Sequence, residues 1–181
     1  RLDPGNTTYN IPILFEIYGS IDVARLQRAI DAVVERHEIL RTVFPAAELQ
    51  ASQKILPEMA VPFVTMDALE DGEDLDFLAR VRKRLSAEST VALSLESGPL
   101  LKFFYFPHRD GHGCLGLVIH HAIFDGWSIS VLLNDLSASY VHDRRGTRQG
   151  LAIQYADYSV WQRNGTGTAD YTRQLAYWKE Q

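Results

Sequence analysis

Hydrophobic residues recur along this chain with two periods, one typical of strands and one typical of helices. Short runs rich in β-branched and aromatic residues predict strands. Their positions are 11–18, 41–44, 53–56, 63–66, 100–106 and 113–119. Apolar residues spaced three and four positions apart predict amphipathic helices. Their positions are 22–37, 75–85, 128–140, 155–164 and 169–181. Because strands and helices alternate irregularly, we predict an α/β fold with a mixed β-sheet packed against helices.

Two short polar signals predict how neighbouring elements begin and join. Asp22 stands at the start of the first helix, where its side-chain oxygen can accept a hydrogen bond from an otherwise unpaired backbone N–H. The dipeptide Asp110-Gly111 lies between the strands 100–106 and 113–119, and such a pair is typical of β-hairpin turns. We therefore expect these two strands to form a hairpin.

The composition excludes several classes of function. The chain has 181 residues, with 18 Lys and Arg against 23 Asp and Glu, and a net charge of -5. Nucleic-acid binding usually shows as a basic stripe, so we expect no nucleic-acid partner. No apolar stretch approaches the roughly 18 to 20 residues of a membrane span, so we expect no membrane partner. Cys114 is the single cysteine, which excludes an internal disulfide and fits a reducing, cytoplasmic location.

The most informative segment is residues 120–128, with the sequence HHAIFDGWS, hereafter the histidine motif. It follows an apolar strand and precedes a helix, and such loops commonly carry functional groups. Histidine can exchange protons or donate a hydrogen bond near neutral pH. The residues alone leave two other interpretations open, namely a structural histidine pair with Asp125 capping the next helix, and a zinc site. No further ligand residue lies at metal-binding spacing, so we predict no metal.

Two further segments accompany the histidine motif. Residues 36–44 read RHEILRTVF, hereafter the arginine motif, and residues 155–161 read YADYSVW, hereafter the aromatic motif. In this order and at these separations, the three motifs resemble the signatures of condensation domains of nonribosomal peptide synthetases. Residues 9–12 and 177–181 fit the same family, so the resemblance covers essentially the whole chain.

The resemblance implies a chloramphenicol-acetyltransferase-like fold, in which two lobes face each other across a tunnel. Residues 1–181 then form the N-terminal lobe, and the C-terminal lobe is absent from this chain. The implied reaction forms an amide (peptide) bond, because the amine of an aminoacyl acceptor attacks an aminoacyl or peptidyl thioester donor. The implied partners are the donor and acceptor peptidyl carrier proteins, the C-terminal lobe and the neighbouring adenylation domain.

The same resemblance implies that no cofactor is bound directly, because the carrier proteins deliver the phosphopantetheine arm. It assigns the catalytic role to His121. A histidine there either deprotonates the attacking ammonium or holds the amine and stabilises the tetrahedral intermediate by hydrogen bonding, and the sequence leaves both roles open. His120 is expected to support its neighbour through packing or a hydrogen bond.

Asp125 is expected to orient the loop rather than to take part in the chemistry. A buried carboxylate needs a cationic partner, and the resemblance implies an arginine. Arg41 of the arginine motif is the candidate, and Arg36 is the alternative. Gly126 is expected to let the loop turn and to leave the tunnel open for the pantetheine thioester.

The remaining motif residues are expected to have mainly structural roles. Trp127 and Ser128 either line the substrate path or begin the helix, and Ser128 is a candidate N-cap. Tyr155, Asp157 and Trp161 of the aromatic motif are expected to lock their helix onto the lobe.

Two alternatives come from other classes of protein. One is a noncatalytic interface domain that recruits carrier or tailoring proteins, since such domains can carry similar motifs. The other is a CoA-dependent acyltransferase of the same superfamily, which the arginine and aromatic motifs disfavour. The two histidines argue against heterocyclization domains, and the residues after Asp125 favour condensation over epimerization. As one lobe, the isolated chain is expected to be inactive and to expose an apolar inter-lobe surface.

Overall fold

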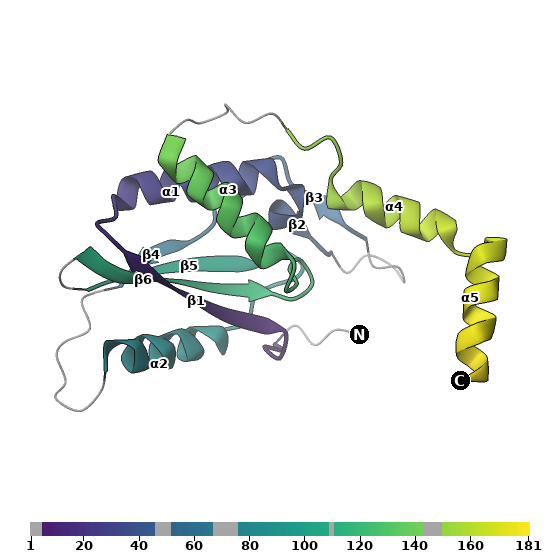
Figure 1. Ribbon diagram of the computed structural model, residues 1–181, viewed down its shortest axis with the longest axis horizontal. Helices are drawn as coiled ribbons and strands as arrows, with labels where there is room; N and C mark the ends of the chain where they lie inside the picture. Colours follow the sequence, from purple (N-terminus) through teal and green to yellow (C-terminus); the bar gives the residue numbers. More distant parts are fainter. Residues whose placement is uncertain (1–4, 46–51, 67–75, 109–110, 143–149) are drawn as a thin grey trace.

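A four-stranded β-sheet forms the centre of the protein, and helices cover both of its faces (Figure 1). The computed structural model describes residues 5–45, 52–66, 76–108, 111–142 and 150–181. The strands of the sheet are β1 (Asn10–Tyr18), β4 (Phe63–Thr65), β5 (Leu101–Pro107) and β6 (His112–His120). A separate two-stranded pair consists of β2 (Thr42–Val43) and β3 (Lys54–Ile55).

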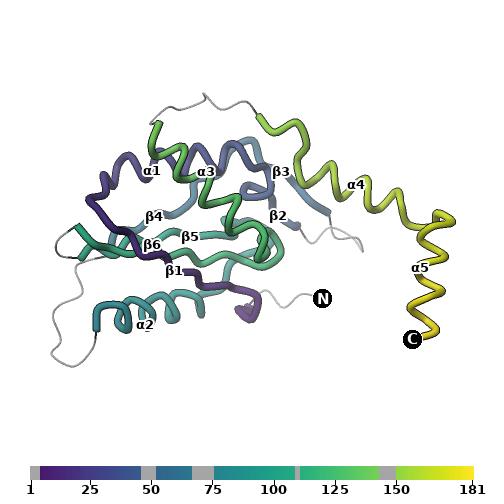
Figure 2. Tube along the Cα trace, in the orientation of Figure 1, coloured from purple at the N-terminus to yellow at the C-terminus, as the bar shows by residue number. Residues whose placement is uncertain are grey.

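The strand order in the sheet is β1-β6-β5-β4. β6 pairs antiparallel with both β1 and β5, whereas β4 runs parallel to β5. β1 and β6 lie side by side, with Asn10 opposite His120, although they are far apart in the sequence (Figure 2). The mixed sheet is therefore confirmed, as is the antiparallel pairing expected of the β5–β6 hairpin. Asp110 of its predicted turn lies outside the described residues.

Helices form two layers and an extended arm. They are α1 (Val23–Arg36), α2 (Phe77–Ser89), α3 (Ser128–His142), α4 (Tyr155–Gly165), α5 (Ala169–Glu180) and the 3-10 helix η1 (Glu38–Arg41). α1 and α3 pack together over one face of the sheet, and α2 covers the other (Figure 1). The backbone N–H of Arg25 donates to Asp22 (2.9 Å), which confirms the predicted N-cap of α1. No helix in the described residues is long and apolar enough to cross a membrane.

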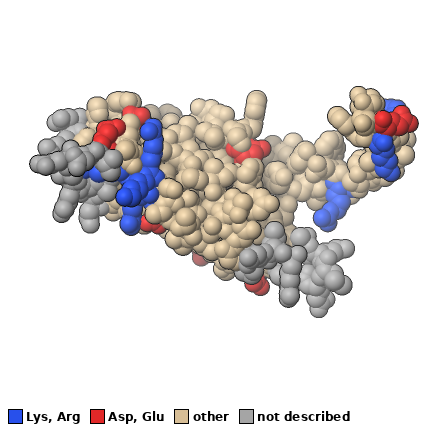
Figure 3. All heavy atoms as spheres, turned by 90° about the horizontal axis from the view of Figure 1, so that it is seen from below, with Lys and Arg blue, Asp and Glu red and all other residues tan. Residues whose placement is uncertain are grey.

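α4 and α5 extend away from the sheet, and we call them the arm (Figure 1). Neither helix contains a buried residue. Seen from below, the centre of the molecule is dominated by uncharged residues, and the described charged residues lie in separate places (Figure 3). Trp161 of α4 and Trp178 of α5 are 70 % and 72 % exposed, so the arm presents apolar surface that the rest of the described chain does not cover.

The core lies between α2, the sheet and the α1–α3 layer. Strands β5 and β6 are almost entirely buried because both faces of the sheet are covered, as for Phe103 and Leu117. Gly116 of β6 lies close to Leu85 of α2. A Cβ at this position would lie 3.0 Å from Cδ1 of Leu85 and 3.1 Å from the ring of Phe106. Glycine therefore permits the helix to pack at this distance.

Candidate active site

The histidine motif begins at the last residue of β6, between the neighbouring strands β1 and β5. The backbone N–H of His120 donates to the carbonyl of Leu100 (2.9 Å). The next N–H, that of His121, donates to the carbonyl of Tyr9 (2.8 Å). The sheet thus fixes the backbone of both histidines from both sides. Because alternate residues of a strand face opposite ways, the two side chains are directed into different environments.

The His120 side chain is buried, and its hydrogen bond defines its protonation. Nδ1 accepts a hydrogen bond from the backbone N–H of Ala122 (3.0 Å). Burial lowers the pKa of His120, and the proximity of His121 lowers it further. The ring is therefore neutral near pH 7, with its proton on Nε2. Its centroid lies 6.1 Å from that of Tyr9. The supporting role of His120 stays a prediction, and a fixed, neutral ring is what that role requires.

The lowered pKa of His120 predicts a stability that depends on pH. Its folded pKa lies below the ordinary 6.5, so the unfolded chain binds the extra proton first and stability falls as the pH drops below 6.5. Urea unfolding between pH 7.5 and 5.5 measures this loss, which for one proton is at most about 1.4 kcal/mol per pH unit. In the His120→Asn variant, which keeps an acceptor near the Nδ1 position, we expect a smaller loss. An equal loss in both proteins would contradict the assignment.

His121, in contrast, is exposed. Among the described residues, its backbone N–H bond to Tyr9 is the contact that holds it. The imidazole is therefore available to a molecule that approaches the end of β6. A surface cavity of about 190 Å³ lies at the other end of this strand, where its lining includes Glu16, Phe77 and His108, so it does not contain the motif.

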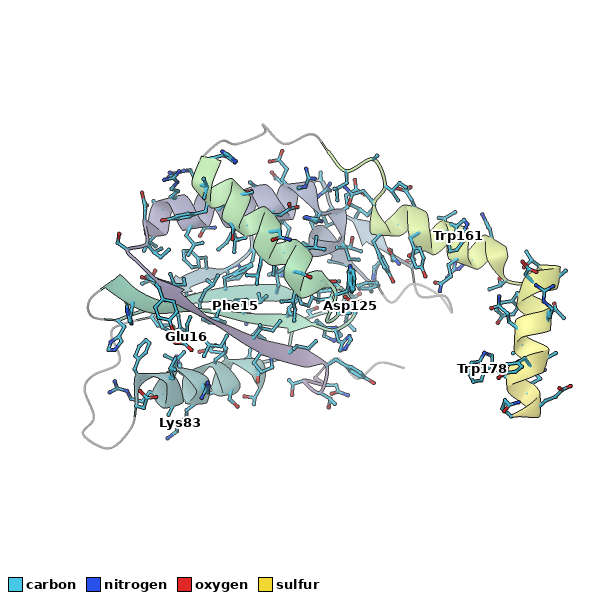
Figure 4. The ribbon with its side chains drawn as sticks, in the orientation of Figure 1. Phe15, Glu16, Lys83, Asp125, Trp161 and Trp178 are labelled. Carbon is cyan, nitrogen blue, oxygen red and sulfur yellow. The ribbon has the colours of Figure 1, made fainter. Side chains whose placement is uncertain are left out.

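The loop after the histidines is anchored by packing and by one carboxylate. Ile123 and Phe124 are buried in the core. Asp125 accepts hydrogen bonds from the backbone N–H (2.9 Å) and the hydroxyl (2.6 Å) of Ser128, the first residue of α3 (Figure 4). These bonds lower the pKa of Asp125, the hydroxyl being the largest cause. The interpretation of Asp125 as a cap of the next helix agrees with this geometry.

The expected ion pair of Asp125 with Arg41, or with Arg36 as the alternative, is wrong, because both arginines have other partners. Asp125 is exposed, so water solvates its charge and no cationic partner is required. Arg41 instead donates through Nη1 to the carbonyl of Leu56, and its Nη2 lies 3.4 Å from Glu38. Arg36 pairs with a different carboxylate, that of Asp135 in α3 (2.9 Å). The two arginines of the arginine motif therefore stabilise the segment at the end of α1, and neither of them contacts the histidine motif through these bonds.

Two further expectations in the loop need correction. Gly126 does not adopt a left-handed backbone, so the turn itself does not require glycine. A Cβ at Gly126 would have no described neighbour within 4 Å, which leaves open space beside the loop. Ser128 donates to Asp125 instead of acting as the cap. Trp127 is 83 % exposed, and its expected place on the substrate path stays a prediction.

Tyr155 and Trp161 of the aromatic motif do not pack α4 onto the lobe as expected. Tyr155 and Trp161 are 50 % and 70 % exposed, and Figure 4 shows Trp161 on the arm. Their rings flank that of Tyr158 at centroid distances of 5.8 and 5.6 Å. Asp157 accepts from the backbone N–H of Gln154 (2.8 Å) in a capping box that begins α4. The motif therefore starts the helix and presents an aromatic row.

Sequence reasoning missed two residues that join these elements. Gln154 connects α4 to the end of α1, and its position three residues before Asp157 was a signal for a capping box. Asp135 is a carboxylate in the apolar face of α3, where a polar residue among leucines was the available signal. In the described residues, no group of three or more His, Cys, Asp and Glu is arranged to hold a metal ion.

Comparison with known proteins identifies the class of this fold. The structure superimposes on the first condensation domain of the CDA synthetase with a TM-score of 0.84 at 22 % identity, over 97 % of this chain and 44 % of that one. It matches SgcC5 from Streptomyces globisporus with a TM-score of 0.80 at 26 % identity, over 99 % of this chain and 41 % of that one. The protein thus has the mixed α/β, chloramphenicol-acetyltransferase-like fold of condensation domains.

The family model described as Condensation domain matches residues 1–181. The chain belongs to this family. It is 37 % identical to the phosphinothricin tripeptide synthetase PhsC of Streptomyces viridochromogenes, over 99 % of this chain and 17 % of that protein. It is 35 % identical to malpibaldin synthetase of Mortierella alpina, over 95 % of this chain and 3 % of that protein. The chain therefore spans a small part of the length of the relatives it matches.

Proposed function

We propose that this chain is the N-terminal lobe of a condensation domain that forms peptide bonds in a nonribosomal peptide synthetase. Similar solved domains align with 97–99 % of this chain over 41–44 % of their own length, which supports one lobe of two. In the proposed domain, a C-terminal lobe faces the histidine motif. The thioester and the amine meet between the two lobes.

One observation carries this proposal: the exposed His121 stands beside a buried, neutral His120 at a strand end that the sheet fixes. The attacking amine needs a free lone pair, and the carbonyl oxygen of the thioester gains negative charge as the bond forms. An accessible imidazole can accept the proton of the ammonium or hold the amine in place. His120 is buried and its Nδ1 is occupied, so His121 is the histidine that can reach the reactants.

The reactants are carried by partner proteins. Donor and acceptor carrier proteins deliver them on phosphopantetheine arms, so this chain needs no tightly bound cofactor of its own. The open space beside Gly126 leaves room for a thin thioester chain next to His121. A side chain at this position would narrow that space.

The proposal is tested by reconstitution. The full-length domain is mixed with a donor carrier loaded with an aminoacyl thioester and an acceptor carrier loaded with a second amino acid. We expect the intact mass of the acceptor carrier to rise by the donor residue, and that of the donor carrier to fall by the same amount. Carriers without the domain are the control. Loaded carriers that bind the domain but exchange no acyl group would contradict the catalytic proposal.

A second function, noncatalytic recruitment, is favoured by one comparison. The structure matches the X-domain in its complex with OxyB from teicoplanin biosynthesis, with a TM-score of 0.71 at 27 % identity over 86 % of this chain. For a recruitment domain, a partner enzyme would bind and no peptide bond would form. The reconstitution separates the two functions, because only the catalytic domain transfers the acyl group.

The proposed single lobe predicts the behaviour of the isolated chain. We expect its rate of peptide formation to be at least about 100-fold below that of the full domain. A single lobe forms only one side of the proposed active site and cannot position two reactants. The arm exposes the aromatic and aliphatic residues Tyr155, Tyr158, Val160, Trp161, Tyr171, Leu175, Tyr177 and Trp178. An apolar surface of this kind promotes self-association.

Sedimentation velocity of the isolated chain measures that association. We expect a concentration-dependent dimer that dissociates more readily when Trp161 and Trp178 are both changed to serine. A matched double change of Ser137 and Ser86, which are exposed on α3 and α2, to alanine is the control. A chain that stays monomeric at high concentration, or that forms peptide at the rate of the full domain, would contradict the single-lobe proposal.

A further inference from the structure

Four polar residues meet where α1, α3 and the start of α4 converge, and we call them the polar junction: Arg36, His37, Asp135 and Gln154. The Asp135 carboxylate accepts a hydrogen bond from Nε of Arg36 (2.9 Å) and lies 2.7 Å from Nε2 of His37. Nε2 of Gln154 donates to the backbone carbonyl of Arg36 (3.0 Å), and its Oε1 accepts from the backbone N–H of Glu38 (3.2 Å). The junction thus connects two layers of the lobe with the arm.

The charged part of the polar junction is largely removed from water. The side chains of Asp135 and His37 are each 12 % exposed, and that of Arg36 is 20 % exposed. Asp135 lies beside the buried residues Leu132 and Leu136 of the same helix. The charge of its carboxylate is therefore stabilised by Arg36 and His37 in place of water. These short contacts form only when α3 lies in a narrow range of positions against α1.

α3 transmits this constraint to the histidine motif. The helix begins at Ser128, whose N–H and hydroxyl both donate to Asp125. A hydrogen-bonded helix moves as a unit, so a shift at Asp135 moves Ser128 and the loop before it. That loop leads directly from His121, which no other described side chain holds in place.

We propose that Asp135 is a positioning residue for His121. The polar junction fixes α3 against α1 and thereby fixes the loop that carries the histidine, while Gln154 ties the arm to the same point. Asp135 itself contacts no reactant in this arrangement. The inference rests on the proposed function, in which His121 acts on the attacking amine.

The test uses the full-length domain with loaded carrier proteins and the near-isosteric variant Asp135→Asn. We expect a 10- to 100-fold lower kcat with KM for the acceptor carrier within twofold, because a misplacement of about 1 Å at the reacting groups can cost about 100-fold in rate. Gln154→Ala, which removes the half-buried link between the polar junction and the arm, is expected to lower kcat by a smaller factor. It also serves as the second variant if Asp135→Asn does not fold.

Two matched controls separate positioning from stability. Asn134→Ala changes an exposed neighbour in α3, and Val33→Ala removes two methyl groups from the core of α1. Val33→Ala is expected to lower the melting temperature without lowering kcat, when assayed well below that temperature. The Hε1 and Nε2 resonances of His120 and His121, observed by histidine-selective labelling, are expected to shift in Asp135→Asn and not in Asn134→Ala.

Several outcomes would overturn the inference. A kcat within twofold of wild type in Asp135→Asn would do so. An equal loss of kcat in Val33→Ala would also do so, because the effect would then be one of stability alone. Unmoved histidine resonances would overturn it whatever the rates. Full activity of His121→Ala would instead contradict the proposed function, and the resonances would still decide whether the polar junction positions the loop.

Discussion

Replacing His121 with alanine in the full-length domain is expected to lower the rate of peptide bond formation by about 100- to 10,000-fold, the usual contribution of a positioned acid–base group. The structure gives the physical reason, because His121 is the exposed member of the pair and His120 is buried with Nδ1 occupied. Transfer between loaded carrier proteins, followed by intact mass, is the measurement. His142→Ala, at the exposed end of α3, is the control and should retain the wild-type rate.

A second substitution at the same position separates the two roles left open for His121. Glutamine keeps a hydrogen-bond donor but cannot take a proton from the ammonium. If His121 acts as a base, His121→Gln should be as slow as His121→Ala. If it holds the amine and stabilises the tetrahedral intermediate, His121→Gln should recover a measurable part of the rate. Wild-type activity in His121→Ala would exclude both roles.

Replacing Gly116 with valine is expected to destabilise the fold by about 1–3 kcal/mol, the usual cost of overpacking a core. Valine favours strands, so a strand considered by itself would gain from the change. The packing reverses this expectation, because a Cβ would already lie 3.0 Å from Leu85 and 3.1 Å from Phe106. Urea unfolding of the isolated chain measures the free energy of unfolding.

A double-mutant cycle tests whether contact with α2 is the cause. Leu85→Ala alone should cost about 2–5 kcal/mol, since Leu85 is buried. If α2 is the obstacle, Gly116→Val should cost less in the Leu85→Ala background, with a coupling of about 0.5–3 kcal/mol. Thr65→Val, at an exposed position of β4, is the control and should change stability by less than about 0.5 kcal/mol. Strictly additive costs would contradict the contact.

Most of the secondary structure could be predicted because it depends on local patterns. The stripe of Leu26, Ile30 and Val33 predicts α1, and Asp22 predicts where it begins. The apolar run before His120 predicts a buried strand, and β6 is buried along most of its length. A contiguous motif needs no tertiary information to be recognised, so the histidine motif and its strand-to-helix position were also predictable.

The partners of charged residues could not be predicted, because they depend on distances between segments far apart in the chain. Arg41 was the expected partner of Asp125, yet Asp125 is exposed and bonds Ser128 three residues away. Arg36 reaches Asp135, which carries no motif signal beyond its place among leucines. Exposure decides whether a carboxylate needs a cation, and exposure is known only once the helices are packed.

The sequence by itself determined the family, the mixed α/β class and the location of the histidine motif, since each is encoded in neighbouring residues or in three motifs read in order. The tertiary structure decided which histidine faces out, because the pairing of β6 with β1 and β5 buries His120 and exposes His121. It also decided that Gly116 must be small and that the polar junction joins α1, α3 and the arm. These outcomes depend on the close packing of whole elements, which no local pattern encodes.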